Sequence, residues 1–217
     1  MADVFEERPE LVEPRRRLYT LIRATPWLDW LLLTKRPENF AARLPADWGA
    51  GYPNVWLGVS VEDQANAEKR IPPLLQMPAA IRFVSYEPAL GPVDFGQLRN
   101  TVGMAEGQSF IDALTGRCWT CSGPDYYDST SADASLDLII VGGESGPGAR
   151  PCDVVWIRST VEQCKAAGVA CFVKQLGAVP YDGMVLLRGG SQDYMRSRAG
   201  SDPSEWPEDL RVQEWPR

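Results

Sequence analysis

Three glutamates and two lysines of this chain each follow a short apolar run, where a folded protein can present them together. They are Glu62, Glu87, Glu144, Lys35 and Lys174. The chain has no histidine, so proton transfer would have to come from Glu, Asp, Lys, Tyr or Cys. The absence of histidine also excludes a Ser-His triad and histidine metal ligands. The catalytic candidates are therefore Glu87, Glu144, Lys35 and Lys174.

The apolar runs that would position these residues have the length of β-strands. They begin near residues 28, 54, 81, 136 and 169, and helical patterns separate most of them. Early spacings of about 26 residues are typical of a βα unit. The runs are apolar rather than alternating, which predicts parallel strands covered on both faces.

The fold class predicted is α/β, either a partial TIM-like (βα)n barrel or an open parallel sheet with about five to six βα units. Residues 1–177 would form this domain, with an insertion at about residues 97–135. Residues 178–217 would form an irregular C-terminal tail.

Polar residues end every predicted strand. In parallel α/β folds the carboxyl ends of the strands meet at one edge, where ligands bind. A polar residue at the end of one strand is explained by contact with solvent. Polar residues at the ends of all five strands predict a binding or catalytic site at that edge. The lysines would either bind an anion or pair with the glutamates. The ligand-binding candidates are Arg36, Ser60, Glu62, Ser85, Gly142, Gly143, Ser145 and Gln175.

Two further motifs carry weaker information. The stretch GGESGPG, residues 142–148, matches neither common phosphate-binding pattern, and it predicts a turn with special backbone geometry. Cys118 and Cys121 have the spacing of half a zinc site, but no second pair lies nearby. These two cysteines are weak zinc candidates, and no other metal ligand is predicted.

Composition limits the partners and the compartment. A net charge of −7 disfavours nonspecific binding to a phosphate backbone. Five cysteines without an export signal favour a reduced, cytoplasmic protein. No apolar stretch is long enough to span a membrane, so no membrane association is expected.

Several blocks in a fixed order resemble the phage Gp thirty-seven/sixty-eight family. They are LLLTKRPENF, NVWLGVSVEDQANAEKRIPPLL, IRFVSYEPALGPVD, LDLIIVGGESGPGARP and VKQLG, and they cover residues 1–177 apart from the insertion. The resemblance implies a phage- or prophage-associated protein of unknown function. That family is similar to radical-SAM proteins, partial TIM barrels with an N-terminal three-cysteine motif for an iron–sulfur cluster.

The chain departs from that pattern because it contains no CxxxCxxC motif. The resemblance implies that the cluster-bearing strand would precede Met1, so the chain is expected to be the C-terminal part of such a barrel. An iron–sulfur cluster and SAM are expected only for a full-length family member, and no cofactor is expected here. A nucleic acid or nucleotide substrate is implied by phage association alone. In radical-SAM enzymes a GGE motif that follows an early strand binds the amino group of SAM. In this chain GGE follows a late strand, so the resemblance does not assign that role to Glu144.

Three hypotheses follow. The first is a radical-SAM-derived barrel domain that modifies a nucleic acid or nucleotide when full length. The second is a cluster-free barrel enzyme that uses Glu and Lys for acid–base chemistry on a small anionic substrate. The third is a noncatalytic binding or remnant domain, which would self-associate through an open sheet edge near residues 28–33.

Overall fold

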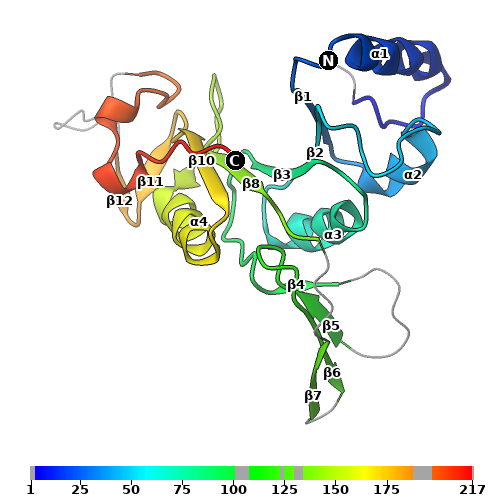
Figure 1. The fold of residues 1–217 in the computed structure, drawn as a ribbon. Coiled ribbons are helices and arrows are strands. Elements are labelled where there is room, and N and C mark those ends of the chain that lie inside the picture. The colour runs from blue at the N-terminus through cyan, green and yellow to red at the C-terminus, as the bar shows by residue number, and fades with distance from the viewer. Residues whose placement is uncertain (1–2, 101–107, 123–124, 130–133, 188–196, 217) are drawn as a thin grey trace.

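A computed structural model describes residues 3–100, 108–122, 125–129, 134–187 and 197–216. Its main feature is a parallel sheet with the strand order β1-β2-β3-β8-β10 (Figure 1). The strands are β1 (Trp30–Thr34), β2 (Val55–Ser60), β3 (Ile81–Tyr86), β8 (Leu138–Gly142) and β10 (Ala170–Gln175). Each begins within two residues of its predicted start, and the α/β fold class predicted from the sequence is confirmed.

The sheet is wound in one direction only. Each new parallel strand adds to the same side of the previous one, and crossovers of this kind are right-handed. The connecting helices α3 (Gln64–Leu75) and α4 (Val154–Ala167) therefore cover the same face of the sheet (Figure 1). This is the topology of a partial βα barrel, with the helices outside.

Four further helices lie in the N-terminal part of the described chain. The short helix η1 (Pro9–Leu11) leads into α1 (Val12–Ala24), and η2 (Pro37–Asn39) leads into α2 (Phe40–Arg43). Phe5 and Phe40 are fully buried and pack edge to face, with ring centroids 4.7 Å apart. This contact ties the N-terminal segment to α2.

The two faces of the sheet differ in burial. On the helix-covered face, Val55, Leu57 and Val59 are fully buried. On the opposite, inner face, Leu31 and Leu33 of β1 are 41% and 40% exposed. The expectation that every strand is covered on both faces is therefore wrong for β1, because no helix packs on the inner side of a singly wound sheet.

Aromatic side chains fill the middle of the inner face. Phe83 lies over Gly58 on the neighbouring strand, and a Cβ at Gly58 would lie 2.4 Å from the Phe83 ring. Trp215 contacts Trp56 and Phe172, with ring centroids 6.0 and 4.9 Å apart. Trp215, in the C-terminal segment, therefore packs against inner-face side chains of both β2 and β10.

The helices that follow β2 and β8 begin with capping carboxylates. Asp63 accepts a hydrogen bond from the Asn66 amide before α3, and Asp153 accepts one from the Val155 amide before α4. Gly168 ends α4 in the left-handed conformation, with φ of 73°. Helix α3 continues through Pro72 and Pro73 for less than one further turn.

Smaller sheets flank the main one. Strands β4 (Leu98–Arg99), β5 (Gln108–Ile111), β6 (Cys118–Ser122) and β7 (Asp125–Ser129) form an antiparallel sheet within the predicted insertion. Strands β9 (Cys152–Asp153), β11 (Pro180–Asp182) and β12 (Val185–Leu186) form another, followed by η3 (Pro203–Glu205) and η4 (Glu208–Leu210). The domain boundaries themselves stay a prediction.

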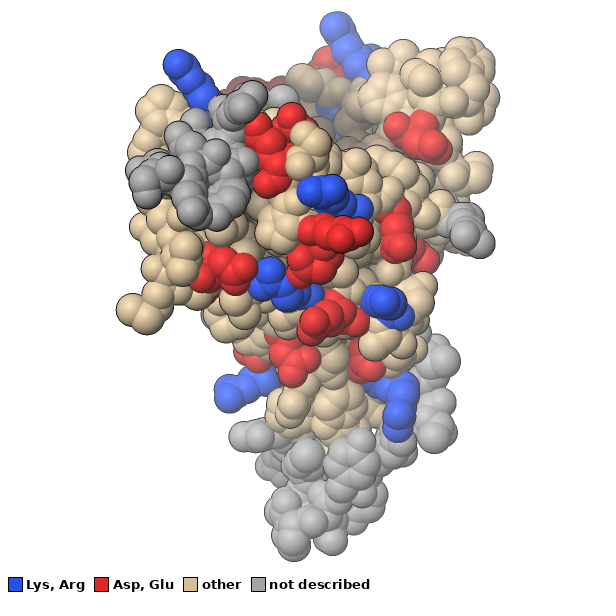
Figure 2. Space-filling model, turned by 90° about the vertical axis from the view of Figure 1, so that its left-hand side faces the viewer, with Lys and Arg blue, Asp and Glu red and all other residues tan. Residues whose placement is uncertain are grey.

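The surface around α4 carries charges of both signs. Acidic and basic side chains are interspersed over this face, and they do not gather by sign (Figure 2). Arg158, for example, pairs with both Asp182 and Asp209. In the part of the chain that is described, no helix is long and apolar enough to cross a membrane.

Candidate functional site

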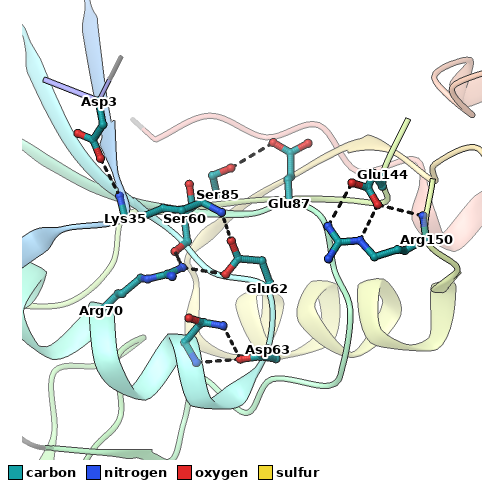
Figure 3. A network of polar contacts seen from close by, with 11 residues as sticks. Asp3, Lys35, Ser60, Glu62, Asp63, Arg70, Ser85, Glu87, Glu144 and Arg150 are labelled. Carbon is teal, nitrogen blue, oxygen red and sulfur yellow. Dashed lines mark hydrogen bonds and ion pairs between the residues drawn. The ribbon is translucent and has the colours of Figure 1, made fainter. Parts of the chain in front are cut away.

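Glu62 and Glu87 lie side by side at the carboxyl edge of the sheet, because they follow the neighbouring strands β2 and β3 (Figure 3). Ser60 and Ser85 end these strands in register with each other and are buried. We call the set Lys35, Ser60, Glu62, Arg70, Ser85, Glu87 and Lys174 the carboxyl-edge cluster.

Glu62 is held by two cations from different elements. Its side chain is 11% exposed, and Lys35 Nζ, from the end of β1, pairs with Oε1. Arg70 Nη1, from α3, lies 2.7 Å from Oε2 and also donates to the Ser60 carbonyl at 2.8 Å. Both carboxylate oxygens therefore have partners, and the group joins β1, β2 and α3.

Glu87 has a less complete set of partners. Its side chain is 15% exposed, and Oε2 accepts hydrogen bonds from Ser85 Oγ and Lys174 Nζ, both at 3.3 Å. Lys174 Nζ also lies 3.2 Å from Oε1, but Oε1 is buried and accepts no hydrogen bond from the described residues. Glu87 is thus held by one exposed cation and one serine, whereas Glu62 is held by two cations.

Glycines bring the β8 loop close to Glu87. A Cβ at Gly142 would lie 2.7 Å from the Gln175 carbonyl oxygen and 3.2 Å from Glu87 Oε1. A Cβ at Gly143 would lie 2.3 Å from the Leu176 carbonyl oxygen. These two positions therefore require glycine because of close packing. The special turn predicted from GGESGPG is confirmed further along, where Gly146 and Gly148 have φ of 94° and 75°.

Glu144 points away from the other two glutamates and toward Arg150 (Figure 3). Arg150 Nε lies 2.8 Å from Oε2, Nη2 lies 3.1 Å from Oε1, and the Arg150 amide also donates to Oε2. The hydrogen bonds from the Arg150 side chain lower the pKa of Glu144 to about 2. Glu144 is thus a carboxylate near neutral pH, which suits binding better than acid catalysis.

The remaining predicted residues are spread around the cluster. Arg36 approaches Glu6 of the N-terminal segment at 3.9 Å, and Ser145 is exposed in the loop after Gly143. Gln175 donates a hydrogen bond to the Gly143 carbonyl at 2.8 Å, which ties β10 to the β8 loop. Lys35 and Lys174 both pair with glutamates. Of the two alternatives for the lysines, anion binding or pairing with glutamates, the contacts in this structure are of the second kind.

The structure adds three residues that sequence reasoning missed. Arg70 and Arg150 are the cations that hold Glu62 and Glu144. Asp3 accepts hydrogen bonds from the Thr34 hydroxyl and the Lys35 amide. Arg70 lies two turns beyond Glu62 on a predicted helix, so a search for cations on that helix could have found it. Asp3 and Arg150 lie in irregular segments with no periodicity to place them.

The described thiols do not fit an iron–sulfur cluster. Cys118, Cys152, Cys164 and Cys171 are buried on different elements, and burial raises the pKa of Cys152 to about 12. No group of three or more Cys, Asp or Glu residues within the described ranges could hold a metal ion. The side chain of Cys121 lies outside the described residues, so zinc at Cys118 and Cys121 stays a prediction.

A cavity of about 950 Å³ lies at the opposite edge of the sheet. Its lining includes Asp137, Lys165, Glu214 and Trp215, near the amino ends of β3, β8 and β10. In βα barrels the amino edge of the strands serves stability and the carboxyl edge carries chemistry. We therefore place the candidate site at the carboxyl edge, despite this cavity at the other end.

Comparison with known proteins gives a family but no activity. A family model described as "Protein of unknown function (DUF5131)" matches residues 1–204. No curated protein and no solved structure matches the chain. The phage and radical-SAM relationships therefore rest on the sequence resemblance alone. Because the match spans most of its length, the chain belongs to this family of proteins of unknown function.

Proposed function

We propose that this chain is a βα-barrel-type enzyme domain that binds a small anionic substrate at the carboxyl-edge cluster. Glu87 would transfer the proton, and Lys174 and Lys35 would bind the anionic group. The single observation behind this proposal is the ion pair of Glu87 and Lys174, in which a mostly buried carboxylate holds a lysine that is 56% exposed, with Nζ 3.2 Å from Oε1. It lies at the edge where parallel α/β folds carry out chemistry.

The lysines support the anion-binding part of the proposal. Lys35 and Lys174 are each 56% exposed, whereas their partners Glu62 and Glu87 are mostly buried. Each ammonium group is therefore open to solvent on one side and held by a carboxylate on the other. A substrate anion could reach both cations from solvent without unpairing a buried glutamate completely.

A radical-SAM-like role is the second candidate, favoured by the sequence blocks and by the singly wound sheet. In that role, full-length relatives would modify a nucleic acid or nucleotide with an iron–sulfur cluster and SAM. No three of the described metal-ligating side chains converge, although Cys164 lies beside Cys171, so no step of the proposal passes through a cluster. Anaerobic incubation with iron and sulfide should leave this chain without cluster absorbance, and a cluster spectrum would favour the second candidate.

Ligand-induced thermal shifts test the proposal with inorganic phosphate and nucleoside monophosphates as probes. A ligand at 100 times its Kd stabilises a protein by about 2.7 kcal/mol. At this chain length each kcal/mol raises Tm by about 2–4 °C, so a saturating probe should raise it by about 5–11 °C. Lys174→Met should remove the shift, and Glu87→Gln should retain it because the anion-binding lysine remains.

The matched control is Lys165→Met, which removes a lysine from the amino-edge cavity. This variant should respond to the probes like the unmodified chain. A shift that Lys165→Met removes and Lys174→Met leaves intact would place binding at the wrong edge and overturn the proposal. A chain that responds to none of the probes would also contradict it.

A further inference from the structure

Strand β1 leaves apolar side chains exposed at one end of the main sheet. It is the terminal strand, and among the described strands it pairs only with β2. Trp27 and Leu28, just before it, are 75% and 47% exposed. Leu31 and Leu33, on its inner face, are 41% and 40% exposed. A sheet edge with this character is a template for pairing with another strand.

The backbone of β1 shows which groups are available for pairing. The Trp30 amide donates to the Asn54 carbonyl on the β2 side at 2.9 Å. Because alternate residues of a strand face alternate sides, Leu32 also bonds toward β2. The amides and carbonyls of Leu31 and Leu33 then face outward. The next outward-facing amide, that of Lys35, donates a hydrogen bond to the Asp3 carboxylate at 3.1 Å. The open edge therefore ends at Thr34.

We propose that two copies of this chain pair edge to edge and antiparallel through β1, about a two-fold axis at Leu32. In this register Leu31 of each copy lies opposite Leu33 of the other copy. Both residues present outward backbone groups, so the register gives two reciprocal pairs of backbone hydrogen bonds. The exposed leucine side chains then meet across the seam. The inference does not depend on the proposed function.

The charges at the two ends of β1 are complementary in this arrangement. Asp29 precedes the strand, is exposed and has no ion-pair partner among the described residues. Lys35 and Arg36 follow it, with side chains 56% and 52% exposed. An axis at Leu32 places Asp29 of each copy opposite Lys35 of the other, next to Arg36. The antiparallel pairing therefore matches opposite charges at both ends of the seam.

The opposite edge of the sheet explains why association would stop at a dimer. The Val173 amide donates to the Val212 carbonyl at 2.8 Å, and the Glu214 amide donates to the Cys171 carbonyl at 2.9 Å. The C-terminal segment thus covers the outer edge of β10. A head-to-tail contact between β1 and β10, which would build an open filament, is blocked, and the self-complementary β1 contact gives a closed dimer.

Sedimentation equilibrium of the full chain tests the proposal, with a dimer as the expected species. Leu31→Lys combined with Leu33→Lys places lysines opposite each other and should weaken association by about 10-fold or more. Asp29→Lys should weaken it by about 2- to 30-fold, because two exposed pairs are lost. Val155→Lys on α4 replaces a side chain that is 45% exposed and should leave association unchanged.

Amide hydrogen exchange distinguishes this seam from any other dimer contact. In the dimer the amides of Leu31, Leu32 and Leu33 should all be protected. In the lysine variant only residue 32 should stay protected, because its bond to β2 is internal. A monomer at every concentration, a dimer that the lysine pair leaves intact, or a dimer in which amides 31 and 33 exchange freely would each overturn the proposal.

Discussion

Gly143→Ala should destabilise the protein by about 2–3 kcal/mol, because the new methyl group would meet the backbone of Leu176 and Gly177. The added Cβ would lie 2.3 Å from the Leu176 oxygen, 2.8 Å from the Leu176 carbonyl carbon and 2.9 Å from the Gly177 Cα. None of these atoms can turn aside as a flexible side chain could. Overpacking of this kind costs about 1–3 kcal/mol, and a backbone obstacle belongs at the upper end. Reduced entropy of the unfolded chain returns less than about 1 kcal/mol.

Urea denaturation and thermal melting measure the effect. At this chain length the expected loss corresponds to a fall in Tm of about 4–12 °C. Gly91→Ala is the matched control, because its Cβ would have only Asp63 Cβ nearby, at 3.8 Å. The control should lie within about 1 kcal/mol of the unmodified chain. If Gly143→Ala were as stable as Gly91→Ala, the close approach of the β8 loop to β10 would be wrong.

Three further predictions address the site and its supports. Arg70→Met should cost about 2 kcal/mol in urea denaturation, because Glu62 stays buried with Lys35 as its remaining cation, and an unchanged midpoint would contradict the network. Asp153→Ala should cost about 1 kcal/mol through the lost cap of α4, whereas Asp153→Asn should cost less. The pKa of Glu144 is lowered from 4.5 to about 2 by Arg150, so this pair contributes stability above pH 4.5 that is lost as the pH falls toward 2. Arg150→Met should therefore be less stable than the unmodified chain at neutral pH, and in acid titrations this difference should shrink as the pH falls from 4.5 through 2. A stability difference of constant size between pH 5 and pH 2 would refute this assignment.

The order of the elements and the convergence of several strand-end residues on one edge could be predicted because both depend on local patterns. Apolar runs of strand length, the cap at Asp153 and the left-handed glycine at Gly168 are each encoded by a few neighbouring residues. Placing Glu62 and Glu87 at one edge required only the rule that parallel strands end on the same side.

Predictions about exposure were less accurate, because exposure depends on what packs against each element. Arg15 looks like its neighbours Arg16 and Arg17 in sequence, yet it is 8% exposed and donates hydrogen bonds to the carbonyls of Val4 and Glu6. The runs of β1 and β2 look alike in sequence. Only the position of β1 at the end of a singly wound sheet leaves its inner face open.

Side-chain pairing was the hardest feature to predict. The orientation of Glu144 is set by Arg150, six residues further along an irregular loop. The separation of Glu144 from Glu62 and Glu87 follows from that contact. A list of polar residues at strand ends therefore locates the edge of the sheet that carries a site, but it does not decide which of those side chains converge.

The measurement that tests the central claim most directly is a heteronuclear NMR titration with nucleoside monophosphates and inorganic phosphate. Amide shifts report where each probe binds without requiring knowledge of the reaction. We predict that perturbed amides gather at residues 85–87, 142–144 and 174–176, around Glu87 and Lys174. Perturbations around Asp137, Lys165 and Glu214 at the amino-edge cavity, or none anywhere, would contradict the assignment of the site to the carboxyl edge.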